Sequence, residues 1–302
     1  MQLDLIGIGE CMVEFRAEPI AGRDDMMRMA WGGDVMNTLV HAGRLGLRTA
    51  FQTRVGNDRF GPWLRAAWHR AGVDLSHAPL VPGENGLYFI TNDPYGERSF
   101  TYRRAGSAAA GMGPEDLDPD LIASSRVVLL SGITQAISES ADRLTAAAAR
   151  IARAVVYDPN YRPQLWSRRG GLESARQAFH RVAPHAAWTL PSYPADVPLI
   201  SNQDLTSGRA LKYFADAGSG GVAMKMGADG VLIQKDGVTH HIPVDPVAEL
   251  VDSTGAGDAW NAAFLSGLHI GEDPELAARR ANAYAAIVLT YPGAIPAEIA
   301  AA

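Results

Sequence analysis

The sequence is poor in cysteine, in positive charge and in long apolar runs, and each shortage argues against a class of protein. Its single cysteine, Cys11, cannot form an intrachain disulfide, and this scarcity is typical of a reducing compartment, so we expect a cytoplasmic protein. The net charge of −6 argues against a nucleic-acid surface, which needs a basic stripe. No run approaches the ~20 apolar residues of a membrane span, and no basic start of an export signal is visible. We expect no nucleic-acid partner and no membrane partner.

Several familiar ligand motifs are also absent. The 8 histidines show no metal-ligand spacing, so no histidine metal site is predicted. Gly257 is followed by Asp258-Ala259 and not by the Lys-Ser/Thr that ends a Walker A loop. Gly7-Ile8-Gly9 follows an apolar strand, but Met12 stands where a dinucleotide fingerprint requires glycine. A dinucleotide-dependent dehydrogenase is therefore disfavoured.

What the chain does contain is an alternation of apolar strands and helices. Its 302 residues are 47% apolar, enough for one large α/β domain or two smaller ones. The alternation predicts a mainly parallel sheet covered on both faces, with ligands beyond the carboxyl ends of the strands. The predicted strands are Leu3–Gly9, Ala50–Val55, Arg126–Ser131, Val155–Asp158, Trp188–Pro191, Gly221–Met226, Gly230–Gln234 and Val238–Ile242. The main predicted helices are Asn37–Leu45, Trp63–Ala71, Ser138–Ala152, Gly171–Val182, Asp204–Ala217 and Pro274–Leu289.

Two stretches break this rhythm. Met12–Ala17 alternates apolar and polar residues, and we expect it to pair at a sheet edge. Gly86–Asn92 and Arg98–Arg104 flank Asp93-Pro94-Tyr95-Gly96, a clear hairpin signal. Residues 12–17 and 86–104 therefore predict a small antiparallel lid beside the main sheet.

The segment from Asp252 to Asp258 is the most informative one. It is predicted to lead from the end of a strand, Ala248–Val251, through a turn into a helix. Gly255 and Gly257 let the turn fold tightly, and its open amides at a helix N-terminus suit a phosphate. Asp258 would repel a phosphate, so its predicted task is to accept a proton from a hydroxyl that attacks phosphorus. The alternative is a plain helix start in which Asp258 only complements the helix dipole.

Two loops add polar groups that suit a ligand. In Trp31–Asn37, Gly33 would allow close backbone approach, and Asp34 and Asn37 could bond ligand hydroxyls. The alternative is a helix cap with Asp34 as the N-cap. In Asp158–Pro163, a proline-fixed loop follows a buried strand, and Arg162 could pair with a carboxylate or a phosphate. The alternative for this loop is a structural turn.

The lid and a late hairpin supply further candidates. Tyr102 and Arg104 share one face of a lid strand, because strand side chains repeat every two residues, and Tyr88 lies on the other lid strand. A solvated hairpin is the alternative for these residues. Lys225–Gly230 joins two strands before the glycine turn, a position that suits a nucleotide, although a tight hairpin also explains its glycines.

Together these residues resemble the ribokinase-like (PfkB) family of carbohydrate kinases over nearly the whole chain. The paired signatures are Gly32-Gly33-Asp34 through Gly46 and Asp252 through Gly267, and the second is highly specific. Within the family, the resemblance is sharpest towards kinases of the sugar acid 2-keto-3-deoxygluconate. The supporting segments are Gly86–Phe89, Gly96–Ala108 and Asp158–Trp166.

The resemblance implies a fold, a reaction and a set of roles. The fold is a three-layer αβα sandwich formed by one kinase domain, residues 1–302, with the lid inside it. The reaction is ATP-dependent, Mg²⁺-dependent phosphorylation of a sugar-acid hydroxyl, giving the 6-phosphate of 2-keto-3-deoxygluconate. Asp258 is implied as the base, with Gly255, Ala256 and Gly257 as the anion hole. Lys225, Gly227, Gly230 and Asn282 are implied along the nucleotide. Gly33, Asp34, Asn37, Tyr88, Tyr102, Arg104 and Arg162 are implied around the sugar acid, whose carboxylate would give the arginines an anionic partner.

Some points stay open. Thr189-Leu190-Pro191-Ser192-Tyr193 stands where many relatives carry Asn-x-x-Glu, so the way Mg²⁺ is held is not defined. Related kinases use a monovalent cation such as K⁺ near the residues that match Asp252 and Thr254. Lid edges predict a homodimer or a higher homo-oligomer. A kinase of another sugar (fructose, ribose or tagatose-type) or of a nucleoside is the first alternative, and a non-catalytic sugar- or nucleotide-binding module is the second.

Overall fold

The computed structural model describes residues 3–18, 26–92, 98–247, 249–297 and 299. Its central sheet has eight strands in the order β14-β13-β12-β11-β10-β9-β1-β4. These strands are β1 (Leu5–Ile8), β4 (Thr49–Gln52), β9 (Val127–Ser131), β10 (Val155–Asp158), β11 (Ala186–Thr189), β12 (Gly221–Lys225), β13 (Val231–Lys235) and β14 (Val238–Ile242). The strands from β4 to β12 pair in parallel, and β13 and β14 extend the sheet as an antiparallel edge. The predicted mainly parallel sheet is confirmed.

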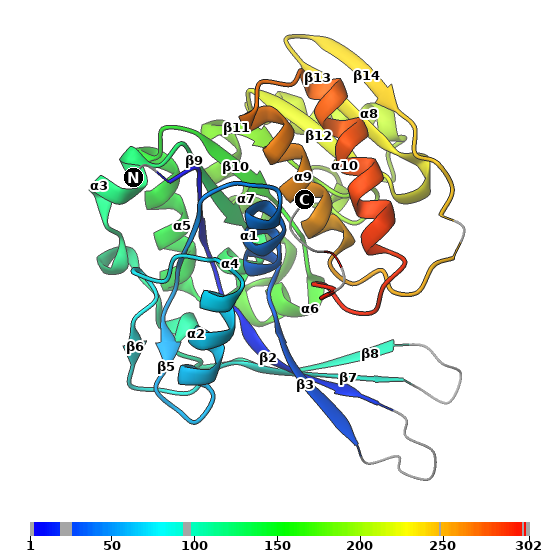
Figure 1. The fold of residues 1–302 in the computed structure, drawn as a ribbon. Coiled ribbons are helices and arrows are strands. Elements are labelled where there is room, and N and C mark those ends of the chain that lie inside the picture. Colours follow the sequence, from blue (N-terminus) through cyan, green and yellow to red (C-terminus); the bar gives the residue numbers. More distant parts are fainter. Residues whose placement is uncertain (1–2, 19–25, 93–97, 248, 298, 300–302) are drawn as a thin grey trace.

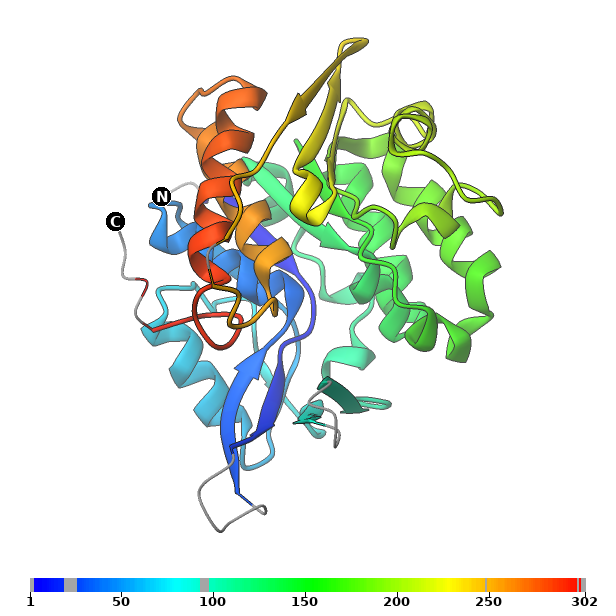
Figure 2. The same ribbon diagram turned by 90° about the vertical axis from the view of Figure 1, so that its right-hand side faces the viewer.

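Helices cover both faces of this sheet (Figures 1 and 2). One face carries α1 (Asp34–Arg44), α2 (Gly61–Arg70), α9 (Ala256–His269) and α10 (Pro274–Val288). The other carries α5 (Glu139–Ile151), α7 (Gly171–Val182) and α8 (Ser207–Asp216), and three short helices, α3 (Pro119–Ser124), α4 (Gly132–Ile137) and α6 (Pro163–Trp166), complete the set. Each layer of helices closes its own apolar core against the sheet, which confirms the three-layer αβα sandwich.

Strand side chains supply both cores in alternation. In β9, Leu129 packs into the core under α1 and α9, whereas Val128 and Leu130 pack into the opposite core. Strands covered on both faces in this way must be apolar throughout, and β1 is buried at all four positions. Their polar residues collect where the strands end, as Asp158 does at the carboxyl end of β10.

The lid is a second sheet that projects from the sandwich (Figure 1). Its strands are β2 (Met12–Ala17), β3 (Met27–Gly32), β7 (Leu87–Asn92) and β8 (Arg98–Arg103), in the order β3-β2-β7-β8. Strands β2 and β7 pair in parallel and the other pairs are antiparallel. The structure thus corrects two predictions. The lid has an additional strand, β3, and β2 lies inside the sheet because β3 and β7 flank it.

Smaller corrections concern local structure. The predicted strand end before the glycine turn is wrong for its described part, Glu249–Val251, which has no strand partner and exposes 65% of Leu250. Asp34 is the first residue of α1 and not its N-cap, which is Gly33. A Cβ on Gly33 would lie 2.2 Å from the Glu10 carbonyl oxygen, so the close approach fits only glycine. The predicted turn at Asp93–Gly96 lies outside the described residues.

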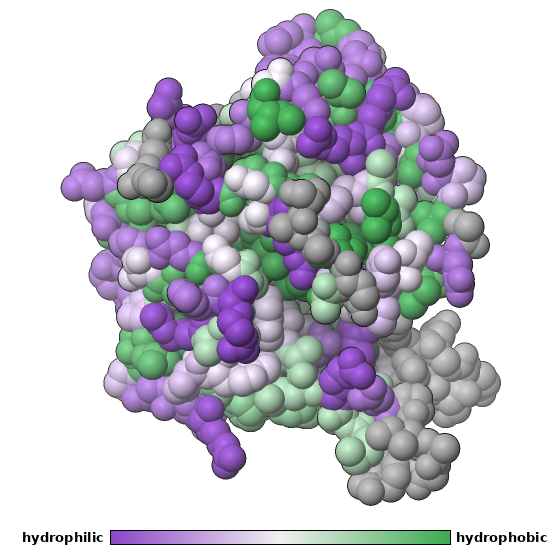
Figure 3. All heavy atoms as spheres, viewed as in Figure 1, coloured by the Kyte–Doolittle hydropathy of each residue, from purple (hydrophilic) through white to green (hydrophobic). Residues whose placement is uncertain are grey.

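Two further short strands, β5 (Val55–Gly56) and β6 (Leu80–Val81), pair beside α2. The surface shown in Figure 3 mixes apolar side chains with hydrophilic ones. Within the described part of the chain, every helix is too short or too polar to cross a bilayer.

Candidate active site

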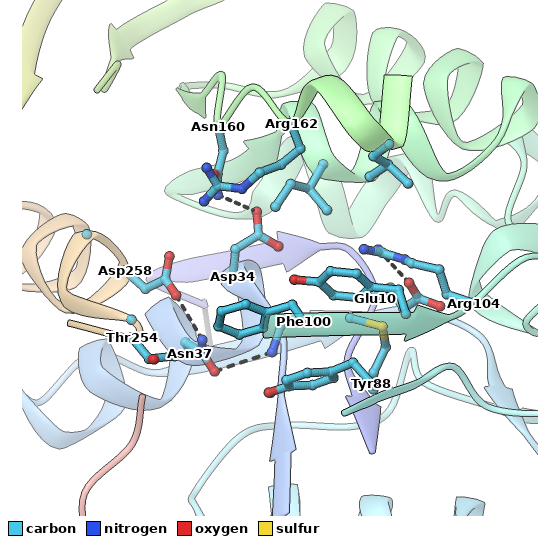
Figure 4. Close-up of a pocket in the computed structure, with 18 of the residues that line it drawn as sticks. Glu10, Asp34, Asn37, Tyr88, Phe100, Arg104, Asn160, Arg162, Thr254 and Asp258 are labelled. Atoms are coloured by element: carbon cyan, nitrogen blue, oxygen red, sulfur yellow. Dashed lines mark hydrogen bonds and ion pairs between the residues drawn. The ribbon is translucent and has the colours of Figure 1, made fainter. Parts of the chain in front are cut away.

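A cavity of about 1030 Å³ lies between the lid and the carboxyl ends of β10, β11 and β12. The lid contributes Met12, Tyr88, Phe100 and Tyr102 to its lining, and the loops after β10, β11 and β12 contribute Asp158, Asn160, Arg162, Arg168, Ser192 and Lys225. Helix α1 and the glycine turn contribute Asp34, Asn37, Thr254, Gly255, Gly257 and Asp258 (Figure 4). Residues far apart in the sequence therefore meet in one space, where the sheet topology predicts a ligand site.

The glycine turn leads into α9 as predicted. Gly255 is the N-cap residue with φ of 74°, a left-handed conformation that favours glycine, and a Cβ there would lie 2.6 Å from the Ala294 Cβ. The Ala256 amide donates to the Ser253 carbonyl at 3.3 Å. Among the described residues, the amides of Gly255 and Gly257 have no protein acceptor. These donors lie at the positive end of α9, an arrangement that suits a phosphate group.

The Asp258 carboxylate lies in this cavity, half-buried, at the start of α9. Asn37 on α1 donates to its Oδ2 at 2.8 Å and so fixes its direction (Figure 4). Burial and the negative charges of Asp34 and Asp158 raise the pKa of Asp258 to about 8, although the Asn37 hydrogen bond opposes the shift. A carboxylate with such a raised pKa is well suited to accept a proton near neutral pH.

Asp34 is held by two neighbours beside Asp258. Its Oδ2 accepts a short hydrogen bond from the Ser131 hydroxyl at the end of β9, and a second from Asn160 Nδ2 at 3.2 Å. Burial and the charge of Asp158 raise the pKa of Asp34, and the Ser131 bond only partly offsets them. Asp34 and Asn160 therefore form a rigid polar pair on the cavity wall opposite the lid, suited to ligand hydroxyls.

The lid presents an aromatic row to the cavity. Tyr88 and Tyr102 face each other across β7 and β8 with ring centroids 5.9 Å apart, and Phe100 stacks on Tyr102 at 6.3 Å. The Tyr88 hydroxyl donates a short hydrogen bond to Glu14 on the neighbouring strand β2. The ring faces of this row offer an apolar, flat surface to the carbon face of a small ligand.

The arginines of the site fall into two groups. The Arg104 guanidinium is almost fully buried and pairs with Glu10 at 2.5 Å, so its charge is balanced inside the protein. Arg162 and Arg168 are exposed and line the cavity, and among the described residues neither forms an ion pair with a carboxylate. An incoming anion is therefore met by Arg162 and Arg168 more directly than by Arg104.

Lys225 ties the ends of β10 and β12 to α9. Its Nζ lies 3.0 Å from Asp158 Oδ2 and 2.9 Å from Asn261 Oδ1, and Asn261 Nδ2 donates to the same Asp158 oxygen at 2.6 Å. This buried triad fixes a positive charge in the cavity beside Asp258. Among the described residues, no cluster of three or more histidine, cysteine or acidic side chains could hold a metal ion by itself.

A buried carboxyl group connects two loops of the cavity. Asp196 accepts hydrogen bonds from the backbone amides of Tyr161 and Ser192, both at 2.7 Å. Burial and the charge of Asp158 raise its pKa to about 6. The loop that carries Asn160 and Arg162 is thereby fixed to the loop that carries Ser192.

Three of the predicted nucleotide residues lie outside the cavity lining. Gly230 has φ of 84°, and a Cβ there would lie 2.2 Å from the Ile242 carbonyl oxygen, so its role in the hairpin is structural. Gly227 lies in the short turn between β12 and β13. Asn282 on α10 is buried, accepts a hydrogen bond from Trp260 Nε1 at 2.8 Å and donates to the Pro243 carbonyl at 3.0 Å. The structure thus gives Gly230 and Asn282 packing roles beside any role at a nucleotide.

Sequence reasoning missed several residues of the lining, among them Glu10, Phe100, Arg168 and Ser192. Glu10 follows the carboxyl end of β1, so its position in the topology was a usable signal. Ser192 follows β11 in the same way. Arg168 lies beyond the short helix α6, and nothing in the sequence showed that α6 would return it to the cavity.

The geometry agrees with comparisons to known proteins. The chain is 30% identical to the 2-dehydro-3-deoxygluconokinase of Haemophilus influenzae, over 97% of this chain and 95% of the relative. It is 33% identical to that of Dickeya dadantii, over 95% of each. Its fold matches the crystal structure of a putative ribokinase II from E. coli in complex with ATP and Mg²⁺, with a TM-score of 0.83, 26% identity and coverage of 97% and 94%. The sequence model of the pfkB carbohydrate kinases matches residues 3–300, and the chain therefore belongs to that family of sugar kinases.

Proposed function

We propose that this kinase phosphorylates a hydroxyl of the sugar acid 2-keto-3-deoxygluconate, also named 2-dehydro-3-deoxygluconate, and forms its 6-phosphate. The observation that carries the proposal is the shared cavity, which is lined by Asp258, by the glycine turn with its open amides and by the exposed side chains of Arg162 and Arg168. Phosphoryl transfer requires a proton acceptor and donors for the phosphate oxygens. A negatively charged acceptor molecule would account for the two exposed arginines in the same cavity. The names of the relatives support the same substrate.

The chemistry assigned to Asp258 is a proton transfer. The acceptor hydroxyl loses its proton to the Asp258 carboxylate while its oxygen bonds to the terminal phosphorus of ATP. The bond from that phosphorus to the bridging oxygen breaks, and ADP leaves. The amides of Gly255 and Gly257 donate to the oxygens of the migrating phosphoryl group, whereas Ala256, whose amide donates to the Ser253 carbonyl, shapes the turn between them. The Asn37 hydrogen bond keeps Asp258 directed at the acceptor.

The sugar acid is assigned to the space between α1, the lid and the loop after β10. Asp34, Asn37 and Asn160 would bond its hydroxyls, because their oxygens and amides point into the cavity (Figure 4). Arg162 and Arg168 would take its carboxylate in a two-pronged geometry. Gly33 admits the ligand close to the backbone, and Tyr88 and Tyr102 would cover it from the lid. Arg104 would act through Glu10, with which it is paired.

ATP and Mg²⁺ are assigned to the side of Lys225. The E. coli structure with ATP and Mg²⁺ supports both. Lys225, Gly227, Gly230 and Asn282 are proposed along the nucleotide, as the family resemblance implies. Mg²⁺ usually binds through phosphate oxygens, water and one or two carboxylates, and Asp158 is the carboxylate beside Lys225 that fits this pattern. When bound, the ion would neutralise charge on the transferring phosphate.

Three further assignments concern the whole chain. We propose that residues 1–302 act as one kinase domain with the lid inside it, that the protein is cytoplasmic and that it forms a homodimer or a higher homo-oligomer. The single cysteine supports the compartment. The two edge strands of the lid, β3 and β8, support the assembly, because each leaves one side without a strand partner within the described residues.

The test is an ADP-release assay over a panel of acceptors: 2-keto-3-deoxygluconate, gluconate, fructose, ribose and a nucleoside. We expect turnover with the keto-deoxy acid that requires both ATP and Mg²⁺. Much faster turnover of fructose, ribose or the nucleoside would refute the proposed substrate and favour another kinase of this family. Binding of sugar or nucleotide without turnover of any acceptor would instead indicate a non-catalytic binding module.

A further inference from the structure

An arginine of the lid reaches the glycine turn. Arg16 lies on β2, and its Nη1 is 2.6 Å from Oδ2 of Asp252, a residue 236 positions later in the chain. The Asp252 side chain is fully buried and that of Arg16 is 19% exposed. Glu14, two positions before Arg16 on the same face of β2, accepts a hydrogen bond from Arg16 Nε at 3.0 Å. The guanidinium is thus held between two carboxylates.

Asp252 organises the backbone around the anion hole. Its Oδ1 accepts a hydrogen bond from the Thr254 amide at 2.9 Å, and its Oδ2 accepts one from the Gly293 amide at 2.8 Å in addition to Arg16. Ala294, the next residue, packs directly against Gly255. His41 on α1 stabilises the position of Ala294, because its Nε2 lies 2.8 Å from the Ala294 carbonyl oxygen. The position of Gly255 therefore depends on Asp252 and its partners.

A monovalent cation does not fit beside this carboxylate. Although burial opposes ionisation, the hydrogen bonds from Arg16 and Thr254 hold the pKa of Asp252 well below its ordinary value, so the group is a carboxylate. Its Oδ2 already carries a cation at hydrogen-bond distance. A second positive charge at the same buried group would be repelled by the guanidinium, because screening by water is weak there.

We infer that Arg16 is a positioning residue that takes the place of a monovalent cation at Asp252, so that the enzyme works without K⁺. The inference rests on the proposed kinase activity. It also gives the lid a link to the phosphoryl site: Tyr88 in the cavity bonds Glu14, Glu14 bonds Arg16, and Arg16 bonds Asp252. The fixed charge is supplied by the same sheet that covers the sugar.

The first experiment compares salts on the unaltered enzyme. Turnover and unfolding temperature are measured in chlorides of K⁺, Na⁺ and tetramethylammonium at equal ionic strength. We expect kcat to agree within about twofold and the unfolding temperature to be the same in all three salts, since no ion-specific site contributes. A K⁺-specific rise of kcat by more than about fivefold, or a K⁺-specific rise of the unfolding temperature, would overturn the inference.

The second experiment removes the guanidinium. For Arg16→Ala we expect kcat to fall by about tenfold or more and to recover partly when K⁺ or guanidinium ion is added, because the vacated carboxylate can then bind a free cation. Arg16→Gln, which keeps most of the side-chain volume, serves the same purpose if the alanine variant fails to fold. Arg28→Ala is the matched control, since Arg28 is an exposed arginine of β3 that pairs with Glu18. Full activity of Arg16→Ala in every salt would overturn the inference.

The two proposals can fail separately. If the unaltered enzyme phosphorylates no sugar acid, the proposed substrate is wrong, while the salt dependence of the unfolding temperature still tests Arg16. A K⁺-specific stabilisation in Arg16→Ala that is absent from the unaltered enzyme and from Arg28→Ala supports the replacement without any turnover assay.

Discussion

Asp258 accepts its hydrogen bond from Asn37 and shares the cavity with two further carboxylates, Asp34 and Asp158. Replacing it with asparagine keeps the shape of the side chain and removes the proton acceptor. We expect Asp258→Asn to lower kcat by about 10²–10⁴ without lowering the unfolding temperature. Asp216→Asn, at an exposed position of α8, is the control and should change neither quantity. Near-normal turnover by Asp258→Asn would falsify the general-base assignment.

Ionisation of Asp258 with rising pH should increase the reaction rate but decrease the stability of the folded protein. The base works when ionised, so kcat/KM should rise with pH up to about 8 and then level off. Between pH 3.8 and about pH 8 the folded protein keeps a proton on Asp258 that the unfolded chain releases. The contribution of this group to the free energy of unfolding is therefore lost as pH rises towards 8. Asp258→Asn should therefore gain stability relative to the unaltered protein across this range in urea titrations. A kcat/KM profile that stays flat from about pH 6 to pH 9 would contradict this.

The exposed arginines make a separate prediction about the substrate. For Arg162→Ala and Arg168→Ala we expect the KM of the sugar acid to rise about tenfold or more, with a smaller change in the KM of ATP. Arg150→Ala, at the exposed end of α5, is the control. If the KM values of the acid and of a neutral sugar rose equally, the carboxylate assignment would lose its support.

At the scale of single residues, contacts between residues close together in the sequence were easier to predict than contacts between distant ones. The glycine turn carries its donors and its carboxylate within a few positions, so their proximity follows from the sequence alone. The pairing of Arg104 with Glu10 is set by the way the lid meets β1, and this contact between remote segments has no local signal. The sequence therefore predicted Arg104 in the site but not that its charge is balanced.

The start of α9 allows a test with two neighbouring glycines. Gly255→Ala places a Cβ 2.6 Å from Ala294 at a φ of 74°, so we expect a loss of stability of about 1–3 kcal/mol together with a loss of turnover. Gly257→Ala meets no atom within 4 Å, so stability should be kept or slightly raised. Its methyl group would still occupy the space beside the open amides, and kcat should fall. Thermal unfolding and kcat, measured on both variants, check the contrast.

An equal loss of stability in the two glycine variants would show that both positions serve the turn alone. Full turnover by Gly257→Ala would show that the phosphoryl group does not approach this part of α9.

Helices and strands were predictable where the apolar pattern of a segment by itself favours the structure that packing and strand pairing stabilise. The predicted bounds of α7, β2, β10 and β14 match the structure, and most other ends shift by a few residues, because capping contacts decide them. The Ser138 hydroxyl, for example, accepts from the Ala141 amide and makes Glu139 the first residue of α5. Strand β3 was missed, because its first residues are exposed and their weak alternation gains stability only from pairing with β2.

The whole molecule is expected to associate through its lid. Met27 and Met29 expose 40% and 42% of their surface on β3, an edge strand of the lid sheet. An open strand edge with apolar side chains favours pairing with a second copy. We expect light scattering to give a multiple of 32.2 kDa, and Met29→Asp to shift the protein to monomers. Ile270→Asp, at an exposed position after α9, should leave the mass unchanged.

A monomeric unaltered protein at assay concentration would contradict the proposed assembly, and so would a Met29→Asp variant of unchanged mass.

The layers of the molecule were predictable because alternation of strands and helices determines them, whereas the mutual position of lid and sandwich depends on contacts between remote segments.

Asp258, the proposed proton acceptor on α9, and Asn37 on α1, which donates a hydrogen bond to it, are separated by 221 positions in the chain. Neither half of the chain carries both members of this pair. Recombination between relatives that exchanged one half would therefore yield a functional hybrid only if the incoming segment restored this pairing, so the two halves are constrained to evolve together.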